Sequence, residues 1–205
     1  MRMKLQSLLL IFAICMSAEA ADDISLMKLK ATNSCEGCDL SNTDLTDADL
    51  TGANLTDADL TDAILVSANL TVADLTDADL TGVILTDAIL SGSYCLDTNL
   101  RHANLIGTDL VYTILTDANL TDANLTDANL TDAFLTDAIL TNANLTNADL
   151  TGADLTGADL TGANLTGANL TNANLTNADL KNLQNLSKAK LCKTTLPWGV
   201  DNSGC

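Results

Sequence analysis

The sequence contains few aromatic side chains for its length of 205 residues. Phe, Trp and Tyr make up only 2% of the chain, although a globular core usually depends on large rings. Hydrophobic residues nevertheless reach 47%, so a core has to be built from Leu and Ala packed in a regular way. The scarcity of aromatic residues therefore favours a repetitive interior over an ordinary globular one.

Basic residues are also scarce. The chain has nine Lys or Arg against 27 Asp or Glu, which gives a formal net charge of −18. Arg101 is the only basic residue in the long middle section. Such a surface repels nucleic acid and anionic lipid. We therefore predict no nucleic-acid partner and no membrane insertion, and cations or basic proteins suit the surface better.

The N-terminus has an apolar run, Leu8–Met16, that is too short to span a membrane. Arg2 and Lys4 precede it, and Ala18-Glu19-Ala20 follows as a small-x-small cleavage motif. This order is typical of a secretory signal peptide, which we predict for residues 1–20. The protein is therefore predicted to be exported to a periplasm or a thylakoid lumen, with secretion as the alternative.

What the sequence does contain is leucine at a fixed spacing. Leu occupies every fifth position from Leu40 to Leu180, with Cys95 as the exception, and Ala usually stands two positions earlier. A period of five does not suit an α-helix, on which five residues advance by about 500°, or a plain strand, in which an odd period alternates faces. If each unit is a short extended piece followed by a bend, Ala and Leu point to the same side. The chain then winds into a solenoid with Leu and Ala inside.

The unit Ala-(Asp/Asn)-Leu-x-x resembles the repeat of the pentapeptide-repeat proteins over about residues 38–180. The resemblance implies an all-β solenoid, a right-handed quadrilateral β-helix of about seven coils with about twenty residues in each. We expect an N-terminal cap over 21–37, the β-helix over 38–180 and a C-terminal cap over 181–205. Short helices are expected in both caps.

Two cysteines, Cys35 and Cys38, form a Cys-x-x-Cys motif. A thioredoxin-type site needs a βαβ context that is absent here. Zinc would need two further ligands, and the single histidine, His102, lies far along the rod. Because disulfides persist outside the cytosol, we predict a structural disulfide at the first coil.

Three further cysteines follow in the predicted mature chain. Cys192 and Cys205 are predicted to close the C-terminal cap with a disulfide, and Cys95, on a Leu position, should be a buried and inert thiol. The segments around the two cysteine pairs resemble the ends of exported pentapeptide-repeat proteins, best known from cyanobacteria. Trp198 differs from these relatives, in which we expect Asp after the proline.

Residues twenty positions apart should stack one above another, which turns the sequence into a map of the surface. One column, named here the aspartate column, consists of Asp57, Asp77, Asp97, Asp117 and Asp137. Like charges about 4.8 Å apart repel each other and can recruit a cation such as calcium, which prefers clustered carboxylates. The alternative is an acidic edge that is solvated and screened by salt. No cofactor is predicted.

A second column interrupts the polar surface. Tyr94, Ile114 and Phe134 occupy outward positions that normally hold Asp or Asn, and three further apolar residues fall beside them, which together define the apolar patch: Tyr94, Leu96, Val111, Tyr112, Ile114 and Phe134. A contiguous apolar patch on a soluble rod often marks an interface. The alternative is packing between stacked side chains that only stiffens the coil. The predicted partner is an unknown protein or a second copy of the chain, which would form a homodimer.

Catalysis finds little support in the sequence. The array has one His and one Arg, and no buried cleft is implied that would separate carboxylate pKa values for acid–base chemistry. We therefore predict an exported, non-enzymatic structural or protein-interaction scaffold, with calcium binding by the aspartate column as an alternative. The resemblance also includes quinolone-resistance proteins, acidic rods that imitate DNA and bind gyrase, a type II topoisomerase. The secretory signal argues against that role, because gyrase is cytoplasmic.

Overall fold

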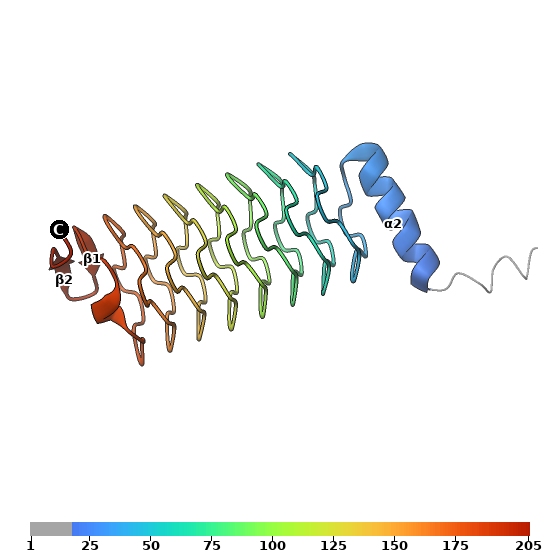
Figure 1. Cartoon of the computed structure of the whole chain (residues 1–205). Coiled ribbons are helices and arrows are strands. Elements are labelled where there is room, and N and C mark those ends of the chain that lie inside the picture. Colours follow the sequence, from blue (N-terminus) through green and yellow to red (C-terminus); the bar gives the residue numbers. More distant parts are fainter. Residues whose placement is uncertain (1–17) are drawn as a thin grey trace, which may run out of the picture.

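The computed structural model describes residues 18–205, so nearly all of the predicted signal peptide lies outside the described residues. Figure 1 shows a rod of stacked coils that carries a helix at one end and two short strands at the other. The regular elements are α2 (Ala18–Thr32), the 3-10 helix η1 (Leu186–Lys188), β1 (Thr194–Leu196) and β2 (Gly199–Asp201). Within residues 18–205, no helix is long and apolar enough to cross a membrane.

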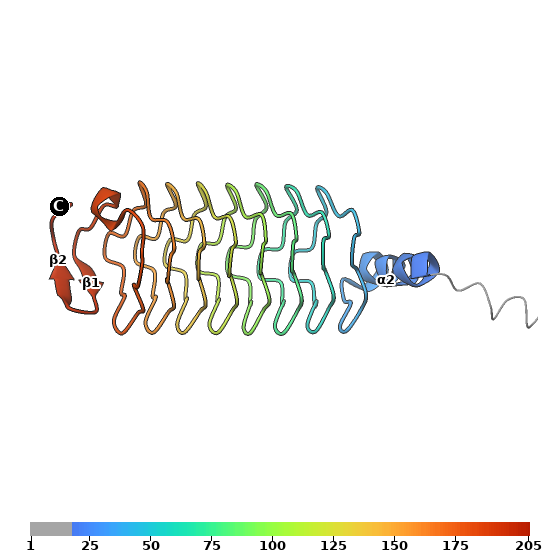
Figure 2. The same cartoon turned by 90° about the horizontal axis from the view of Figure 1, so that it is seen from below.

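Each coil is joined to the next by isolated parallel bridges. The residue before each repeat Leu pairs with the residue twenty positions later, from Ser34↔Asn54 through Asp159↔Asp179. Backbone hydrogen bonds follow the same register, as from the Leu115 amide to the Phe134 carbonyl at 2.7 Å. Twenty residues, or four five-residue units, therefore complete one coil, and the coils lie in register along the rod (Figure 2).

A left-handed residue turns every corner of the coil. The second residue after each Leu position, including the one that Cys95 occupies, has a positive φ, as at Asp97 (53°), Gly152 (72°) and Asn172 (61°). Gly, Asn and Asp adopt this conformation most readily. The residue before Leu then closes the turn with its side chain: Asn124 Oδ1 accepts hydrogen bonds from the Thr126 amide at 3.2 Å and the Thr126 hydroxyl at 2.6 Å. The polar residues of the repeat therefore have defined structural roles.

The interior contains the repeat Leu and Ala side chains. From Ala53 to Leu175 these side chains are at most 1% exposed. Each buried Leu contributes about 1.5–3 kcal/mol before the loss of chain entropy is counted. Because every coil contacts only its neighbours, the stability of the rod is a sum over similar layers.

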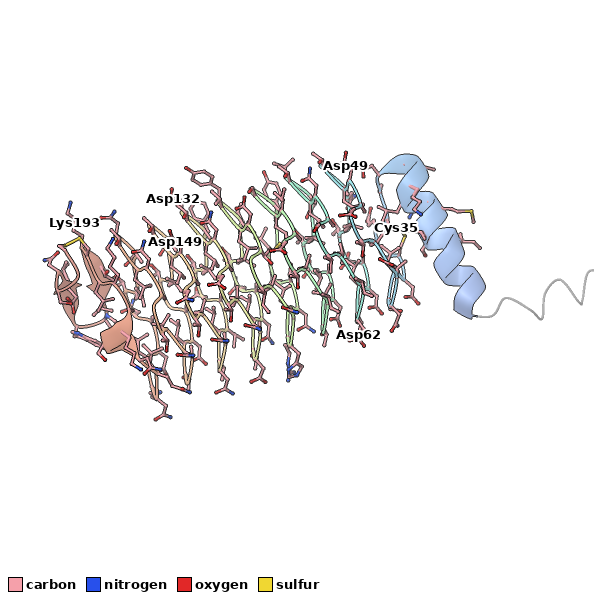
Figure 3. The ribbon with its side chains drawn as sticks, in the orientation of Figure 1. Cys35, Asp49, Asp62, Asp132, Asp149 and Lys193 are labelled. Atoms are coloured by element: carbon pink, nitrogen blue, oxygen red, sulfur yellow. A yellow bond between two sulfur atoms is a disulfide. The ribbon has the colours of Figure 1, made fainter. Side chains whose placement is uncertain are left out.

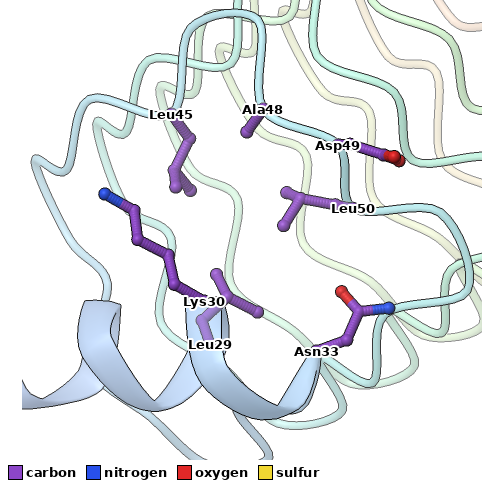
Figure 4. Close-up of a pocket in the computed structure, with 7 residues that line it drawn as sticks. All are labelled: Leu29, Lys30, Asn33, Leu45, Ala48, Asp49 and Leu50. Atoms are coloured by element: carbon purple, nitrogen blue, oxygen red, sulfur yellow. The ribbon is translucent and has the colours of Figure 1, made fainter.

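Helix α2 covers the N-terminal end of the rod, where a short helix was expected in the cap of residues 21–37. Leu29 is buried against the first coil, and Leu26 packs on the same core. Beside this contact lies a cavity of about 250 Å³ whose lining is shown in Figure 4: Leu29, Lys30, Asn33, Leu45, Ala48, Asp49 and Leu50. The disulfide Cys35–Cys38 is present at the first coil, as predicted.

The C-terminal end combines η1 with an antiparallel hairpin of β1 and β2, in which Thr194 pairs with Asp201. Thr195 also bridges to Asn174, so β1 continues the ladder of the coils and β2 covers its edge. The sequence predicted helical turns after Leu180 and gave no indication of the hairpin. The predicted disulfide between Cys192 and Cys205 is present.

Candidate interaction surface

Three apolar side chains stack on one side of the rod, on consecutive coils. Tyr94 bridges to Ile114, and Ile114 bridges to Phe134. Tyr94 is 46% exposed and Phe134 is 47% exposed, while Ile114 between them is half-buried. The column predicted from the twenty-residue register therefore exists and faces solvent.

The other members of the apolar patch lie at the two corners beside this column. Leu96 and Val111 are half-buried at their corners, and Tyr112 is exposed. Val72, which was not among the predicted patch residues, is also exposed and lies in the same corner column as Tyr112, two coils away. Between them stands Gly92, where a Cβ would make an ordinary van der Waals contact with Val72 Cγ1 at 3.5 Å. The signal that could have found Val72 is its forty-residue offset from Tyr112.

Val72 and Tyr112 both occupy the left-handed corner position, with φ of 51° and 57°. For a residue with a side chain other than Asn or Asp, this conformation costs about 1–2 kcal/mol. The repeat mostly supplies Gly, Asn or Asp at this position, and those residues are also polar or small. The two residues therefore depart from the repeat both in conformational preference and in the apolar surface that they add.

Carboxylates surround the stack of Tyr94, Ile114 and Phe134, named here the apolar column. Asp74 bridges to Tyr94 at one end, and Asp154 bridges to Phe134 at the other. Each residue of the apolar column is one rung of the stack. Along one edge, the corner that follows each rung holds an exposed aspartate of the aspartate column, in order Asp97, Asp117 and Asp137. On the coils of the apolar column, this face and its two corners carry no Lys or Arg. The charged groups around the apolar column are therefore all acidic.

The opposite edge of the face carries Asp132, which occupies the corner column of Tyr112 one coil further on. In Figure 3, Asp132 and Asp49 point outward along one edge of the rod, whereas Asp62 points away along the other. Acidic side chains thus line more than one edge, and the apolar patch interrupts only one side.

The five aspartates of the aspartate column are all exposed at left-handed corners. Their backbones are tied together, as in the hydrogen bond from the Asp77 amide to the Leu96 carbonyl at 2.9 Å. Among the residues that the structure describes, no group of three or more His, Cys, Asp or Glu could hold a metal ion. Calcium binding by this column stays a prediction.

The coil beneath the patch also departs from the repeat in its interior. Cys95 is buried with a free thiol, and burial raises its pKa to about 12. Ser93, Thr98 and Thr113 replace Ala and are fully buried. The Thr98 hydroxyl donates to the Leu75 carbonyl at 2.8 Å. The sequence signal for this departure is Ser or Thr on Ala positions, which the predicted patch did not include.

His102 is an exposed residue at a left-handed corner. Its Nδ1 lies 3.8 Å from Oδ2 of Asp122 on the next coil, and both side chains face solvent. At the N-terminal cap, the Lys28 ammonium lies 3.5 Å from Cys38 Sγ, which is held in the disulfide. Neither arrangement brings the groups needed for nucleophilic or acid–base catalysis into one cleft.

A family model described as pentapeptide repeats matches the chain in eight copies, in segments that run from residue 34 to residue 196. The chain belongs to the pentapeptide-repeat family. Membership of this family implies the right-handed quadrilateral β-helix expected from the repeat. No curated protein sequence matches this pentapeptide-repeat protein significantly.

Several solved pentapeptide-repeat structures are similar to the chain. HetL, a protein involved in heterocyst differentiation regulation from the cyanobacterium Nostoc sp. strain PCC 7120, is 33% identical over 85% of this chain and 96% of that chain, with a TM-score of 0.33. QnrB1, a plasmid-mediated fluoroquinolone resistance protein, is 26% identical over 83% and 80%, with a TM-score of 0.47. A pentapeptide-repeat protein from the Arabidopsis thaliana thylakoid lumen is 25% identical over 63% and 72%, with a TM-score of 0.26.

Proposed function

We propose that this pentapeptide-repeat protein is an exported, non-enzymatic scaffold that binds another protein through the apolar patch. The observation that carries the proposal is the stack of Tyr94, Ile114 and Phe134 on three consecutive coils, at positions where the repeat mostly places Asp or Asn. An exposed apolar cluster on an otherwise polar rod is typical of a protein interface.

The strained corner residues support the same proposal. Val72 and Tyr112 cost conformational energy without filling the core, since both are exposed. Backbone strain that folding does not require is a reason to look for a functional cause. A partner that covers Val72 and Tyr112 would recover free energy from the burial of their apolar surface.

A scaffold fits the chemistry of the rod better than an enzyme does. The repeat hydroxyls and carboxylates are occupied in turns, as when Asp149 Oδ1 accepts from both the amide and the hydroxyl of Thr151. Pentapeptide-repeat proteins are generally non-enzymatic scaffolds. Binding of a type II topoisomerase stays a prediction that no specific contact favours.

Export to a periplasm or a thylakoid lumen is part of the proposal. The predicted signal peptide supports it, and the disulfides Cys35–Cys38 and Cys192–Cys205 suit an oxidising compartment. The similarity to a pentapeptide-repeat protein of the Arabidopsis thaliana thylakoid lumen is in keeping with this location.

Affinity capture from the exported fraction tests the proposal. The bait is the native chain or the double variant Ile114→Asp, Phe134→Asp, which restores the residue type that the repeat places at these positions. The matched control is Ile64→Asp, Ile84→Asp, because these two half-buried residues also stack on each other, on another side of the rod.

We expect a specific partner, or a second copy of the chain, to be lost from the patch variant and kept by the control. Circular dichroism checks that all three baits are folded, and light scattering reports the oligomeric state. Equal capture by the native chain and the patch variant, with unchanged oligomeric state, would refute the proposal.

A further inference from the structure

We infer that the partner binds through a basic amphipathic α-helix, which lies along the rod axis on the apolar patch. This inference rests on the proposed function and specifies the partner of the same surface. It follows from the length of the apolar column, the spacing of its rungs and the charges around it.

The apolar column sets the length of the partner segment that can lie on it. Its three rungs are bounded by Asp74 at one end and Asp154 at the other. Coils stack about 4.8 Å apart, so the rungs from Tyr94 to Phe134 cover roughly 9.6 Å along the axis. The apolar surface is therefore a short, narrow strip that runs parallel to the rod.

A helix matches this spacing and a strand does not. On a helix, residues three or four apart advance by about 4.5–6 Å and residues seven apart by about 10.5 Å, so apolar side chains at i, i+3 or i+4 and i+7 meet successive rungs. Same-face residues of a strand lie about 6.8 Å apart and fall out of step by the third rung.

The backbone of the coils excludes docking by strand addition at this place. The Ile114 amide donates to the Ser93 carbonyl at 3.0 Å, and the Leu115 amide donates to the Phe134 carbonyl at 2.7 Å. These groups are already paired along the ladder, whereas strand addition needs free ones. The partner therefore has to dock by side chains, as a helix laid along an apolar strip does.

Charge complementarity makes the helix basic. Asp97, Asp117 and Asp137 follow the three rungs along one edge, and Asp74 and Asp154 close the two ends. No Lys or Arg of these coils lies on this face or at its corners to neutralise them. A Lys or Arg on one flank of the helix meets each aspartate, which speeds encounter and fixes the register.

The two edges of the strip differ, and this gives the helix a direction. One edge carries an aspartate beside each of the three rungs, whereas the other carries Gly92, the exposed Tyr112 and a single carboxylate, Asp132, beside Phe134. The helix therefore has basic residues along one whole flank, and on the other flank apolar or small residues against Gly92 and Tyr112 with one basic residue at most against Asp132. Reversing the helix end to end would place its basic flank against Tyr112.

A second copy of the chain is a poorer occupant. In the described residues, α2 is the only helix long enough to reach all three rungs. In the predicted mature chain, its sequence contains Asp22 and Asp23 as well as Lys28 and Lys30. A helix without net positive charge does not complement an acidic surface, so we favour a different, basic protein.

Fluorescence anisotropy with a synthetic helical peptide tests the inference on the full mature chain. The probe is a labelled peptide of about 15 residues, roughly four turns, with Leu at i, i+3 or i+4 and i+7 positions and Lys along one flank. The matched peptide carries Glu in place of Lys. The first protein variant is the triple Asp97→Asn, Asp117→Asn, Asp137→Asn, which keeps residues that tolerate the left-handed corner.

The matched control protein is Asp47→Asn, Asp87→Asn, Asp127→Asn, because it removes the same charge from a different corner of the rod. We expect the Lys peptide to bind the native chain and the control alike, and to bind the first triple variant roughly tenfold more weakly with a smaller dependence on salt. The Ile114→Asp, Phe134→Asp variant and the Glu peptide should show no binding.

Three outcomes overturn the inference. They are equal weakening in both triple variants, equal binding of the Lys and Glu peptides, and a native dimer that the Ile114→Asp, Phe134→Asp change dissociates. If a partner captured from the exported fraction needs Ile114 and Phe134 but not the three aspartates, the proposed function stands and the basic helix is refuted. If capture needs neither set, the proposed function itself fails.

Discussion

The aspartate column should make the rod less stable than a neutral column would, and Asp97→Asn tests this. Asp97 lies between Asp77 and Asp117, and the amides of Asp77 and Asp97 bond to the next coil at 2.9 and 3.1 Å. Two unit charges about 4.8 Å apart repel by about 0.9 kcal/mol in water. At physiological ionic strength, a Debye length of about 8 Å reduces this to about half. Two neighbours therefore cost about 1 kcal/mol.

Asp87→Asn is the matched control. Asp87 occupies the same turn position, with φ of 56° against 53° at Asp97, and both side chains are exposed. Its neighbours in the column are Ser67 and Gly107, so it has no like charge directly above or below. Asn suits a left-handed corner as well as Asp does. The two substitutions therefore differ in their charge environment and not in their backbone.

Urea denaturation followed by circular dichroism measures both variants, because urea adds no salt. We expect Asp97→Asn to raise the free energy of unfolding by about 1 kcal/mol at physiological salt and by about 0.4 kcal/mol or less at about 1 M salt. Asp87→Asn should leave the free energy of unfolding within about 0.3 kcal/mol of the native value at both salt concentrations. Equal gains in the two variants, or a gain that persists at high salt, would refute the reasoning.

Three further predictions concern the interior and the turns. Leu145→Ala should lower the free energy of unfolding by about 3–4 kcal/mol, because the hydrogen-bonded ladder keeps the coils from closing on the cavity that the substitution leaves. Leu180→Ala, at the half-buried end of the rod, should cost less, and equal costs in urea titrations would contradict this. The buried Cys95 thiol, with its pKa raised to about 12, should resist a thiol reagent at pH 8 until the chain unfolds, and rapid labelling of the folded protein would show an open interior. The side-chain hydrogen bond from Thr161 is the main cause that lowers the pKa of Asp159. The stabilisation from this carboxylate is therefore complete above the unfolded pKa of about 3.9 and is lost as the pH falls through the lower folded pKa. Thr161→Val removes the hydroxyl and keeps the amide bond to Asp159 at 2.8 Å, so it should flatten the stability profile below about pH 4, and an unchanged profile would count against the side-chain bond.

The repeat predicted the solenoid well because burial depends on spacing alone. Leu at every fifth position and Ala two places earlier form one continuous inner surface only if the chain bends after each unit. The twenty-residue register then follows from the four-sided coil of the family, and it places Tyr94, Ile114 and Phe134 in one column. The bridges Tyr94↔Ile114 and Ile114↔Phe134 confirm that register.

The C-terminal hairpin could not be predicted in the same way. Thr194–Leu196 and Gly199–Asp201 are too short to show a periodic pattern, and β1 is positioned by the bridge from Thr195 to Asn174 on the last coil. Strands of this length depend on tertiary contacts more than on their own propensity. The left-handed corners are a different case, because Asp, Asn and Gly two places after most Leu residues already indicate them.

The interior and the surface depart from the repeat in the same coils. Among the described residues, all buried polar side chains within the array lie between positions 93 and 113, beneath or beside the apolar patch: Ser93, Thr98, Thr108 and Thr113. Three of their hydroxyls donate to carbonyls of the preceding coil at 2.8 Å, a bond that the usual Ala cannot make. These bonds add to the backbone ladder at the coils that carry Tyr94, Tyr112 and Ile114. A surface held in place before a partner arrives loses less conformational entropy on binding, so the interior changes favour binding at the interface that we propose on this surface.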